Sequence, residues 1–105
     1  MVKQLKNLNE FHETLKAAGC TLVVIDFTAT WCGPCKFISP VFEKLSEELS
    51  NVIFCKVDVD DASDVSEHCK IQSMPTFVFY KNNNKIEQFS GANADKLKET
   101  IKRLS

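Results

Sequence analysis

The chain has 105 residues, of which 13 are basic and 14 acidic, so its formal net charge is −1. This length predicts one domain over residues 1–105, and its 44% apolar and 26% charged residues are ordinary globular usage, which argues against disorder and fibrous repeats. The longest aliphatic run, Leu22–Ile25, is far shorter than the roughly 20 residues of a membrane span, and the interleaved charges leave no basic footprint for nucleic acid.

The first elements are predicted to be a strand, a helix and a second strand. A short strand over Val2–Leu5 is followed by Asn7, whose side chain can cap a helix that Gly19 ends. This helix has one apolar face, formed by Leu8, Phe11, Leu15 and Ala18. The β-branched run Thr21–Ala29 lacks clean alternation of apolar and polar residues, which is typical of a strand buried on both faces.

The middle of the chain predicts a helix, a strand and a short helix. The first helix opens near Trp31 and runs to about Leu49, and Pro40 should kink it because proline removes a hydrogen bond and crowds the preceding turn. A third strand is predicted over Val52–Asp58. An acidic turn then leads into a short helix over about Ala62–Cys69.

The last part of the chain predicts a hairpin and a helix. The runs Thr76–Lys81 and Lys85–Ser90 flank three asparagines, a composition that favours a hairpin turn. Asn93 can cap a last helix whose inner face holds Leu97, Ile101 and Leu104. The resulting order, βαβαβαββα, predicts an α/β fold in which a mixed five-stranded sheet carries four helices on both faces.

Cysteine usage gives the first indication of function. The count of five is odd, and no apolar segment of the secretory type stands near the N-terminus, so a secreted disulfide framework is not expected. We therefore expect a soluble protein of the cytosol. The roles left open for its cysteines are metal binding, redox catalysis and burial as small apolar side chains.

The pair Cys32 and Cys35 stands where a buried strand ends and a helix begins. The N–H groups and dipole at a helix N-terminus favour the thiolate there. Pro34 suits the first helical turn, and Gly33 leaves room for the disulfide of another protein. We expect Cys32 to lie outermost and act as the nucleophile, and Cys35 to be shielded and act as the resolving thiol.

The same spacing also occurs in half of a zinc site, which needs a second pair of ligands. Cys55 and Cys69 are not closely spaced, and His12 and His68 lack ligand-like spacing, so redox chemistry is favoured over zinc. We expect Cys55 to be an inert buried thiol and Cys20 to be exposed without function. Cys69 is expected to be accessible to oxidation or covalent modification. Both histidines are expected on helix surfaces.

The segment from Trp31 to Lys36 resembles the active-site motif of the thioredoxins. Further similar segments are Asp26–Phe27, Pro40, Val57–Asp60, Met74–Phe77 and Phe89–Ala92. The resemblance runs essentially end to end and is strongest to animal-type cytosolic thioredoxins. It implies the thioredoxin fold and a protein-disulfide reductase with many protein substrates. It also implies no bound cofactor or metal, because electrons come from NADPH through a flavin-containing thioredoxin reductase.

Asp26 lies between apolar residues in the second strand, just upstream of the cysteine pair. Burial of a carboxylate raises its pKa toward neutrality, and such a group can transfer a proton to or from Cys35. The alternative is an exposed carboxylate at a strand end. The resemblance places Asp26 beneath the cysteines, and some thioredoxins keep a lysine near this acid where Lys56 stands. Lys56 is equally well explained as a solvated surface residue.

The resemblance also implies a substrate-binding surface. Pro75 corresponds to a cis-proline that faces the cysteines, although a sequence by itself favours trans. In the family, the residue before this proline offers its backbone to the substrate strand, a form of β-addition. The surrounding surface would be formed by Trp31, Val59, Met74, Gly91 and Ala92. For Trp31 and Met74 the alternative role is filling of the core.

Two other functions remain open. An oxidase or isomerase would share the fold and differ in the redox poise of the pair, which Gly33 and Pro34 tune here toward reduction. A binding module would hold partners with redox turnover incidental. We expect a monomer, because Ala62 and Ser73 stand where some animal thioredoxins carry further cysteines. Its expected roles are electron transport and cell redox homeostasis in the cytoplasm, with the nucleus as a second location.

Overall fold

A computed structural model describes all residues from 1 to 105. Its elements are β1 (Val2–Gln4), α1 (Leu8–Ala18), β2 (Leu22–Thr28), α2 (Gly33–Glu48), β3 (Val52–Asp58), α3 (Ser63–His68), β4 (Thr76–Lys81), β5 (Asn84–Ser90) and α4 (Ala94–Leu104). The predicted order is confirmed, the bounds of β3 and β4 are those predicted, and the ends of the other elements lie within two residues of the prediction. No helix has both the length and the apolar character needed to cross a membrane.

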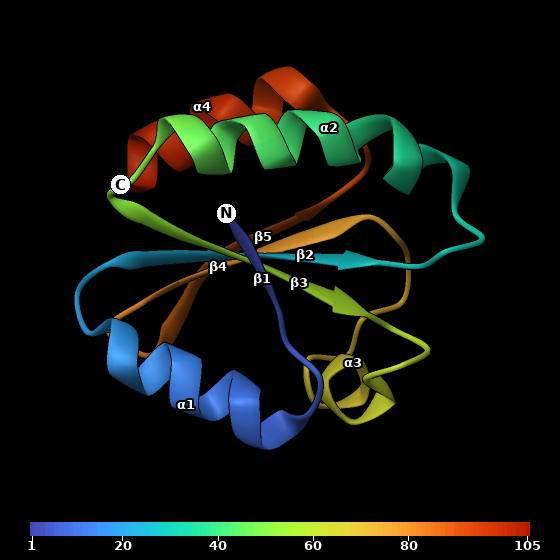
Figure 1. Ribbon diagram of the computed structural model, residues 1–105, viewed down its shortest axis with the longest axis horizontal. Coiled ribbons are helices and arrows are strands. Elements are labelled where there is room, and N and C mark those ends of the chain that lie inside the picture. The colour runs from blue at the N-terminus through green and yellow to red at the C-terminus, as the bar shows by residue number, and fades with distance from the viewer.

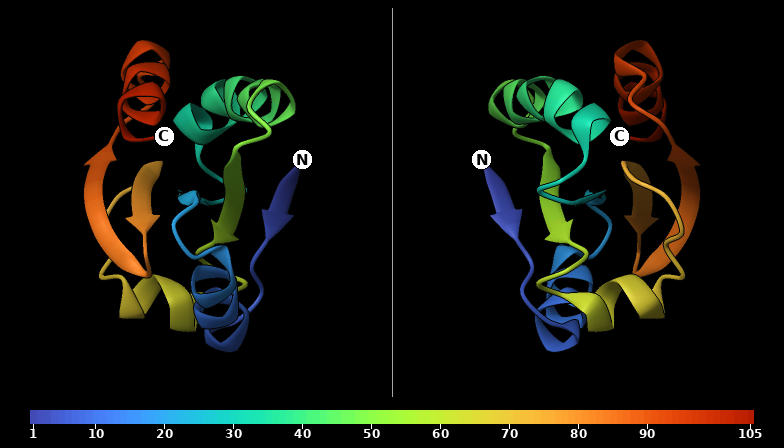
Figure 2. Two further views of the ribbon diagram at one scale, coloured as in Figure 1. Left: turned by 90° about the vertical axis from the view of Figure 1, so that its left-hand side faces the viewer. Right: turned by 90° about the vertical axis from the view of Figure 1, so that its right-hand side faces the viewer.

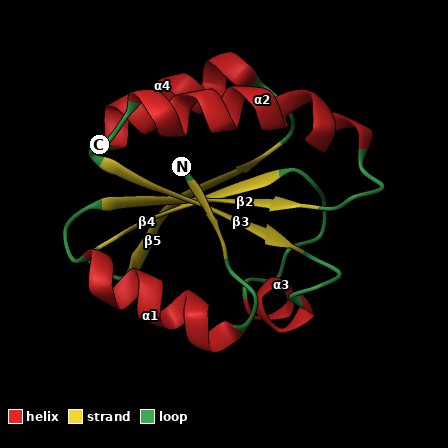
Figure 3. Ribbon diagram, in the orientation of Figure 1, coloured by secondary structure: helices red, strands yellow, loops and turns green.

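The sheet has the order β1-β3-β2-β4-β5. Strand β3 pairs in parallel with β1 and β2, whereas β4 pairs antiparallel with β2 and β5. Helices α2 and α4 cover one face of the sheet, and α1 and α3 cover the other (Figures 1 and 3). The predicted mixed sheet with helices on both faces is therefore confirmed, and turned views show the helices above and below it (Figure 2).

Two cores result from this layering, because alternate side chains of a strand point to opposite faces. In β2, Val23, Ile25 and Phe27 belong to the core beneath α1 and α3, whereas Leu22 and Val24 belong to the core beneath α2 and α4. All five are 2% exposed or less, which confirms that β2 is buried on both faces.

The caps and the hairpin turn form as the sequence predicts. The Asn7 side chain accepts the Glu10 N–H at 2.9 Å, and Asn93 accepts the Lys96 N–H at 3.0 Å. Asn82 and Asn83 have φ values of 53° and 64°, the left-handed conformation that a two-residue turn of type I′ requires at both positions. Asparagine adopts this conformation more readily than most residues, so these two join β4 to β5.

Helix α2 contains Pro40 in its interior. Since proline has no N–H, the carbonyl one turn earlier lacks its usual partner. The first turns of α2 are tilted from the rest of its axis, as the predicted kink requires (Figure 1).

Candidate active site

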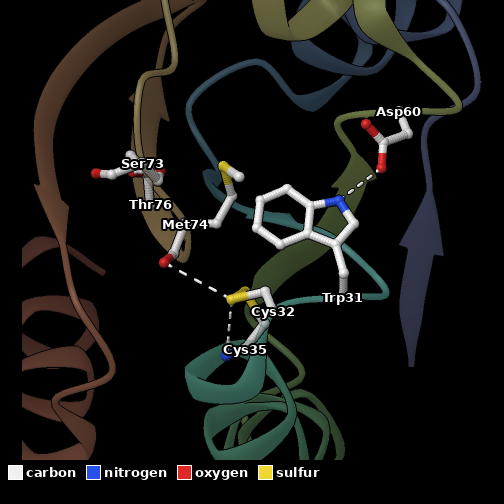
Figure 4. The surroundings of a disulfide bond; sticks show 7 residues. All are labelled: Trp31, Cys32, Cys35, Asp60, Ser73, Met74 and Thr76. Atoms are coloured by element: carbon white, nitrogen blue, oxygen red, sulfur yellow. Dashed lines mark hydrogen bonds between the residues drawn. A yellow bond between two sulfur atoms is a disulfide. The ribbon is translucent and has the colours of Figure 1, made fainter.

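Cys32 and Cys35 form a disulfide at the start of α2, with their Cα atoms 5.3 Å apart. Cys32 is the N-cap residue of this helix, and its sulfur accepts the backbone N–H of Cys35 at 3.2 Å (Figure 4). The Cys35 N–H lies in the first turn, where a helix offers no carbonyl partner, and it donates to the Cys32 sulfur instead. This geometry favours negative charge on Cys32 when the pair is reduced.

The exposure of the two cysteines differs from the prediction. Cys35 is 2% exposed, as expected of a shielded thiol, but Cys32 is also buried, at 5%. Cys32 is the more exposed of the two, as expected, but it does not project from the surface. Met74 and Val59 pack against the small cluster that the cysteines form with Ala29. These contacts join distant parts of the chain, so the local sequence around the pair did not indicate them.

Asp26 lies in β2 and is 4% exposed, and its Oδ1 atom has no hydrogen-bond partner. Burial raises the pKa of this carboxyl to about 7, and the nearby Lys56 ammonium opposes the rise. The buried position confirms one prediction and rules out the exposed strand end. Lys56 stands opposite Asp26 in the register of β2 and β3 and is half-buried, so it is more than a solvated surface residue.

A cleft of about 390 Å³ reaches Asp26 from the surface. Its lining includes Lys56, Cys35 and the polar side chains of Thr28, Ser39 and Glu43. A polar cleft of this volume has room for water molecules that can relay a proton. The cleft therefore joins the buried acid, the inner cysteine and solvent in one space.

The loop before β4 faces the disulfide. The Met74–Pro75 peptide bond is cis, as the resemblance implied. The Met74 carbonyl oxygen lies 3.7 Å from the Cys32 sulfur (Figure 4). The Met74 N–H donates to no other backbone group of the chain. Gly91, at a φ of 105°, donates its N–H to the Pro75 carbonyl at 2.9 Å and so places Gly91 and Ala92 beside this loop.

Trp31 is 66% exposed, so core filling does not explain it. Its indole N–H donates to Asp60 Oδ2 at 2.9 Å, which holds the ring beside the disulfide (Figure 4). Asp58 stabilises the turn that carries this acceptor, because its Oδ1 accepts the N–H groups of Asp60 and Asp61. The acidic turn was visible in the sequence, but its contact with Trp31 was not predicted.

The other cysteines lie apart from this arrangement. Cys20 is exposed as predicted, and Cys55 is fully buried, which raises its pKa to about 11. Cys69 is half-buried and its sulfur lies 3.6 Å from the Tyr80 hydroxyl. Burial raises the pKa of Cys69, so this thiol is less open to modification than predicted.

The two histidines are exposed on helices, as predicted, but they lie together rather than apart. The ring centroids of His12 and His68 are 5.2 Å from each other, an approach that the topology creates and their spacing in the sequence does not indicate. Three metal-binding side chains do not converge at any point of the chain.

Known proteins are similar to this chain over nearly its whole length. The family model for thioredoxin matches residues 2–103. Thioredoxins from Gallus gallus and Homo sapiens are 58% and 57% identical to this chain, and each alignment covers 99% of both chains. The solved structure of Fasciola hepatica thioredoxin superposes with a TM-score of 0.97 at 40% identity, covering 98% of this chain and 99% of that one.

Proposed function

The chain belongs to the thioredoxin family, and on this premise we propose that its dithiol reduces disulfides in many protein substrates and is recharged from NADPH by a flavin-containing thioredoxin reductase. The observation that carries the proposal is the Cys32–Cys35 pair at the N-terminus of α2. Family membership and this pair establish a dithiol oxidoreductase. The direction of the reaction, its substrates and the recharging step are the proposed parts.

The first chemical step is attack by the Cys32 thiolate on one sulfur of the substrate disulfide. A bond forms between Cys32 and that sulfur, and the other substrate sulfur leaves as a thiolate that takes a proton from water. Helix α2 stabilises the attacking thiolate through its N-terminal N–H groups, one of which contacts the Cys32 sulfur.

The second step resolves this mixed disulfide. Cys35 loses its proton to the Asp26 carboxylate, directly or through water in the cleft, and attacks the Cys32 sulfur. The Cys32–Cys35 disulfide forms, and the remaining substrate sulfur leaves as a thiolate. Two electrons have then moved from the protein to the substrate. An acid with a pKa of about 7 is suited to this transfer, because both of its forms are populated near neutral pH.

Substrate docking is proposed at the free backbone of Met74. Its N–H donates to no other backbone group of the chain and its carbonyl faces Cys32, so an extended substrate segment can add to this edge through main-chain hydrogen bonds. The side chains around it are apolar or small and comprise Trp31, Val59, Met74, Gly91 and Ala92. Main-chain bonding over such a surface makes few demands on the substrate sequence.

The proposal further places the protein, as a monomer, in the cytoplasm or the nucleus. Its high identity to animal thioredoxins supports this, and a reducing compartment keeps such a pair supplied with electrons. No metal or bound cofactor takes part in the proposed reaction.

The decisive experiment couples insulin-disulfide reduction to NADPH oxidation through an animal thioredoxin reductase. Wild-type protein should consume NADPH only when insulin and reductase are both present, and Cys32→Ser protein should consume none. Consumption that is equal for wild-type and Cys32→Ser proteins would contradict the proposal. A Cys35→Ser protein should accumulate covalent complexes with substrate through Cys32, which non-reducing gels and peptide mapping can identify.

The oxidase alternative is distinguished by the reduction potential of the pair. Protein disulfide isomerases have potentials higher than those of thioredoxins by roughly 90 mV. A potential in the higher range would favour the oxidase or isomerase. If Cys32→Ser protein bound partners as tightly as wild type and the wild type showed no turnover, a binding module would be favoured instead.

A further inference from the structure

The loop that faces the disulfide carries three successive carbonyl groups, those of Ser73, Met74 and Pro75, and the outer two are held by hydrogen bonds within the chain. The Ser73 carbonyl accepts the Thr76 hydroxyl at 2.6 Å, and the Pro75 carbonyl accepts the Gly91 N–H at 2.9 Å. Between them, the Met74 carbonyl makes no such bond and points at the Cys32 sulfur (Figure 4). The peptide that faces the reacting sulfur is therefore held by hydrogen bonds on both sides.

The Thr76 hydroxyl both donates and accepts a hydrogen bond on the Ser73 side of this peptide. Its single proton is donated to the Ser73 carbonyl, so the contact of 2.8 Å between Thr76 Oγ1 and Ser90 Oγ is donated by Ser90. The bonds run in one direction, from Ser90 through Thr76 to Ser73. In such a chain each bond polarises and strengthens the next.

This chain of hydroxyls is not needed to satisfy buried polar groups at its ends. Ser73 and Ser90 are both exposed, so the carbonyl of one and the hydroxyl of the other could bond to water instead. Thr76, in contrast, is 2% exposed and lies directly opposite Ser90 in the pairing of β4 with β5. The bonds thus fix the loop before β4 to the sheet at a defined position.

We propose that Thr76 and Ser90 are positioning residues that hold the Met74 peptide at the correct distance and angle from Cys32 for a bound substrate strand. The inference rests on the proposed function and deepens it, because it concerns the docking of extended protein substrates at that same site. A small disulfide without a peptide backbone does not use the Met74 edge. Loss of the Thr76 hydroxyl should therefore affect protein substrates selectively.

The test compares Thr76→Val, which keeps the shape of the side chain but removes its hydroxyl, with Thr76→Ser, which keeps the hydroxyl. Thr100→Val is a matched control, since Thr100 is 4% exposed and donates a hydroxyl bond of 2.7 Å to the Lys96 carbonyl in α4. Each protein is reduced in advance and mixed with insulin or with 5,5′-dithiobis(2-nitrobenzoate). Second-order rate constants are measured without any reductase, and circular dichroism verifies the fold.

We expect Thr76→Val to slow insulin reduction about tenfold, the effect of one lost hydrogen bond in the transition state, and to change the reaction with the small disulfide less than about twofold. Thr76→Ser and Thr100→Val should match wild type on both substrates. If Thr76→Val fails to fold, Ser90→Ala takes its place. It removes only the donor to Thr76, and we expect a smaller but equally selective loss.

The positioning role would be overturned if Thr76→Val reduced insulin at the wild-type rate, or if both substrates slowed equally. It would also be overturned if the serine variant lost as much activity as the valine variant. A wild-type protein that reduced the small disulfide but not insulin would instead overturn the proposed function.

Discussion

Asp26 is the residue at which the chemistry and the stability of the protein oppose each other. Burial raises its pKa to about 7, whereas the ordinary value in an unfolded chain is 3.8. Below about pH 4 the carboxyl is protonated in both states. Between about pH 4 and 7 the unfolded chain releases this proton and the folded chain keeps it, so the free energy of unfolding falls as pH rises. Above about pH 7 the folded chain is ionised as well, so the free energy of unfolding falls no further, and its total decrease is about 4 kcal/mol.

Asp26→Asn should remove this dependence. Relative to wild type, the variant should gain stability as pH rises, and the difference in free energy of unfolding should grow by about 4 kcal/mol between pH 4 and 8. Urea unfolding of the oxidised proteins at several pH values measures it. The variant should also reduce insulin more slowly, because Cys35 loses its proton acceptor. A stability difference that stays constant over this range would show that the acid is not buried as described.

A substitution at Lys56 tests the charge interaction between this residue and Asp26. Its ammonium lowers the pKa of Asp26, so Lys56→Met, which keeps the length of the side chain, should move that pKa further above 7. Titration of the Asp26 carboxyl carbon by NMR measures the shift directly. Lys98→Met is the control, because Lys98 lies on α4 and does not line the cleft. An unchanged pKa in Lys56→Met protein would show that the two side chains do not interact.

At the scale of elements, the turn that ends α3 has a lysine, Lys70, at a position where glycine is usual. The Ile71 N–H donates to the Ser66 carbonyl and the Lys70 N–H to the Glu67 carbonyl, at 3.0 and 3.1 Å, which is the pattern of a Schellman motif. Lys70 takes the left-handed position of this motif, with a φ of 56°. Glycine is the usual residue there, since a side chain makes this conformation less favourable by roughly 1–2 kcal/mol.

Lys70→Gly should therefore stabilise the protein. Part of the relieved strain is offset by the greater freedom of glycine in the unfolded chain, so we expect a gain of about 1 kcal/mol. Thermal unfolding should show a midpoint higher by about 4–8 °C for a domain of this size. The same substitution at Lys98, inside α4, should instead cost about 1 kcal/mol. Destabilisation by both variants would contradict the proposed strain at Lys70.

Elements of this fold follow from local patterns, which is why the sequence predicts them well. Asn7 and Asn93 cap helices through bonds to N–H groups three residues away, and the asparagine turn joins adjacent strands. Such features depend on neighbours in the chain. The left-handed Lys70 was not predicted, because lysine carries no preference for that conformation and only the contacts of α3 impose it.

The part of the site that lies within one stretch of the sequence, from Asp26 to Cys35, was predictable. The disulfide pair and the buried Asp26 lie close together in sequence, and both were expected. The burial of Cys32 and the bond from Trp31 to Asp60 join segments that are distant in the chain. Patterns within a segment cannot indicate such contacts, and the resemblance to thioredoxins supplied the cis bond before Pro75.

At the scale of the whole molecule, the proposed chemistry is confined to one end of the sheet. Cys32 follows the carboxyl end of β2, and Cys20 precedes the other end, so the strand of seven residues separates them by roughly 20 Å. Cys55 lies in the core beneath α1 and α3, and Cys69 packs against that same core and contacts Tyr80. None of these three free thiols occupies the start of a helix.

This separation predicts that the three free cysteines are dispensable for turnover. A protein carrying Cys20→Ser, Cys55→Ser and Cys69→Ser should reduce insulin at nearly the wild-type rate. Its free energy of unfolding should fall by about 1–3 kcal/mol, because a serine hydroxyl replaces the fully buried Cys55 thiol. The insulin assay measures the first quantity and urea unfolding the second.

The single variants assign the two effects to their sources. Cys20→Ser, at an exposed position, should change neither activity nor stability, whereas Cys55→Ser should account for most of the stability loss. Cys69→Ser should lose little, because a serine hydroxyl can still bond to Tyr80. Loss of insulin reduction in a triple variant that circular dichroism shows to be folded would mean that a thiol outside the Cys32–Cys35 pair takes part in turnover. The single variant that reproduced the loss would identify that thiol.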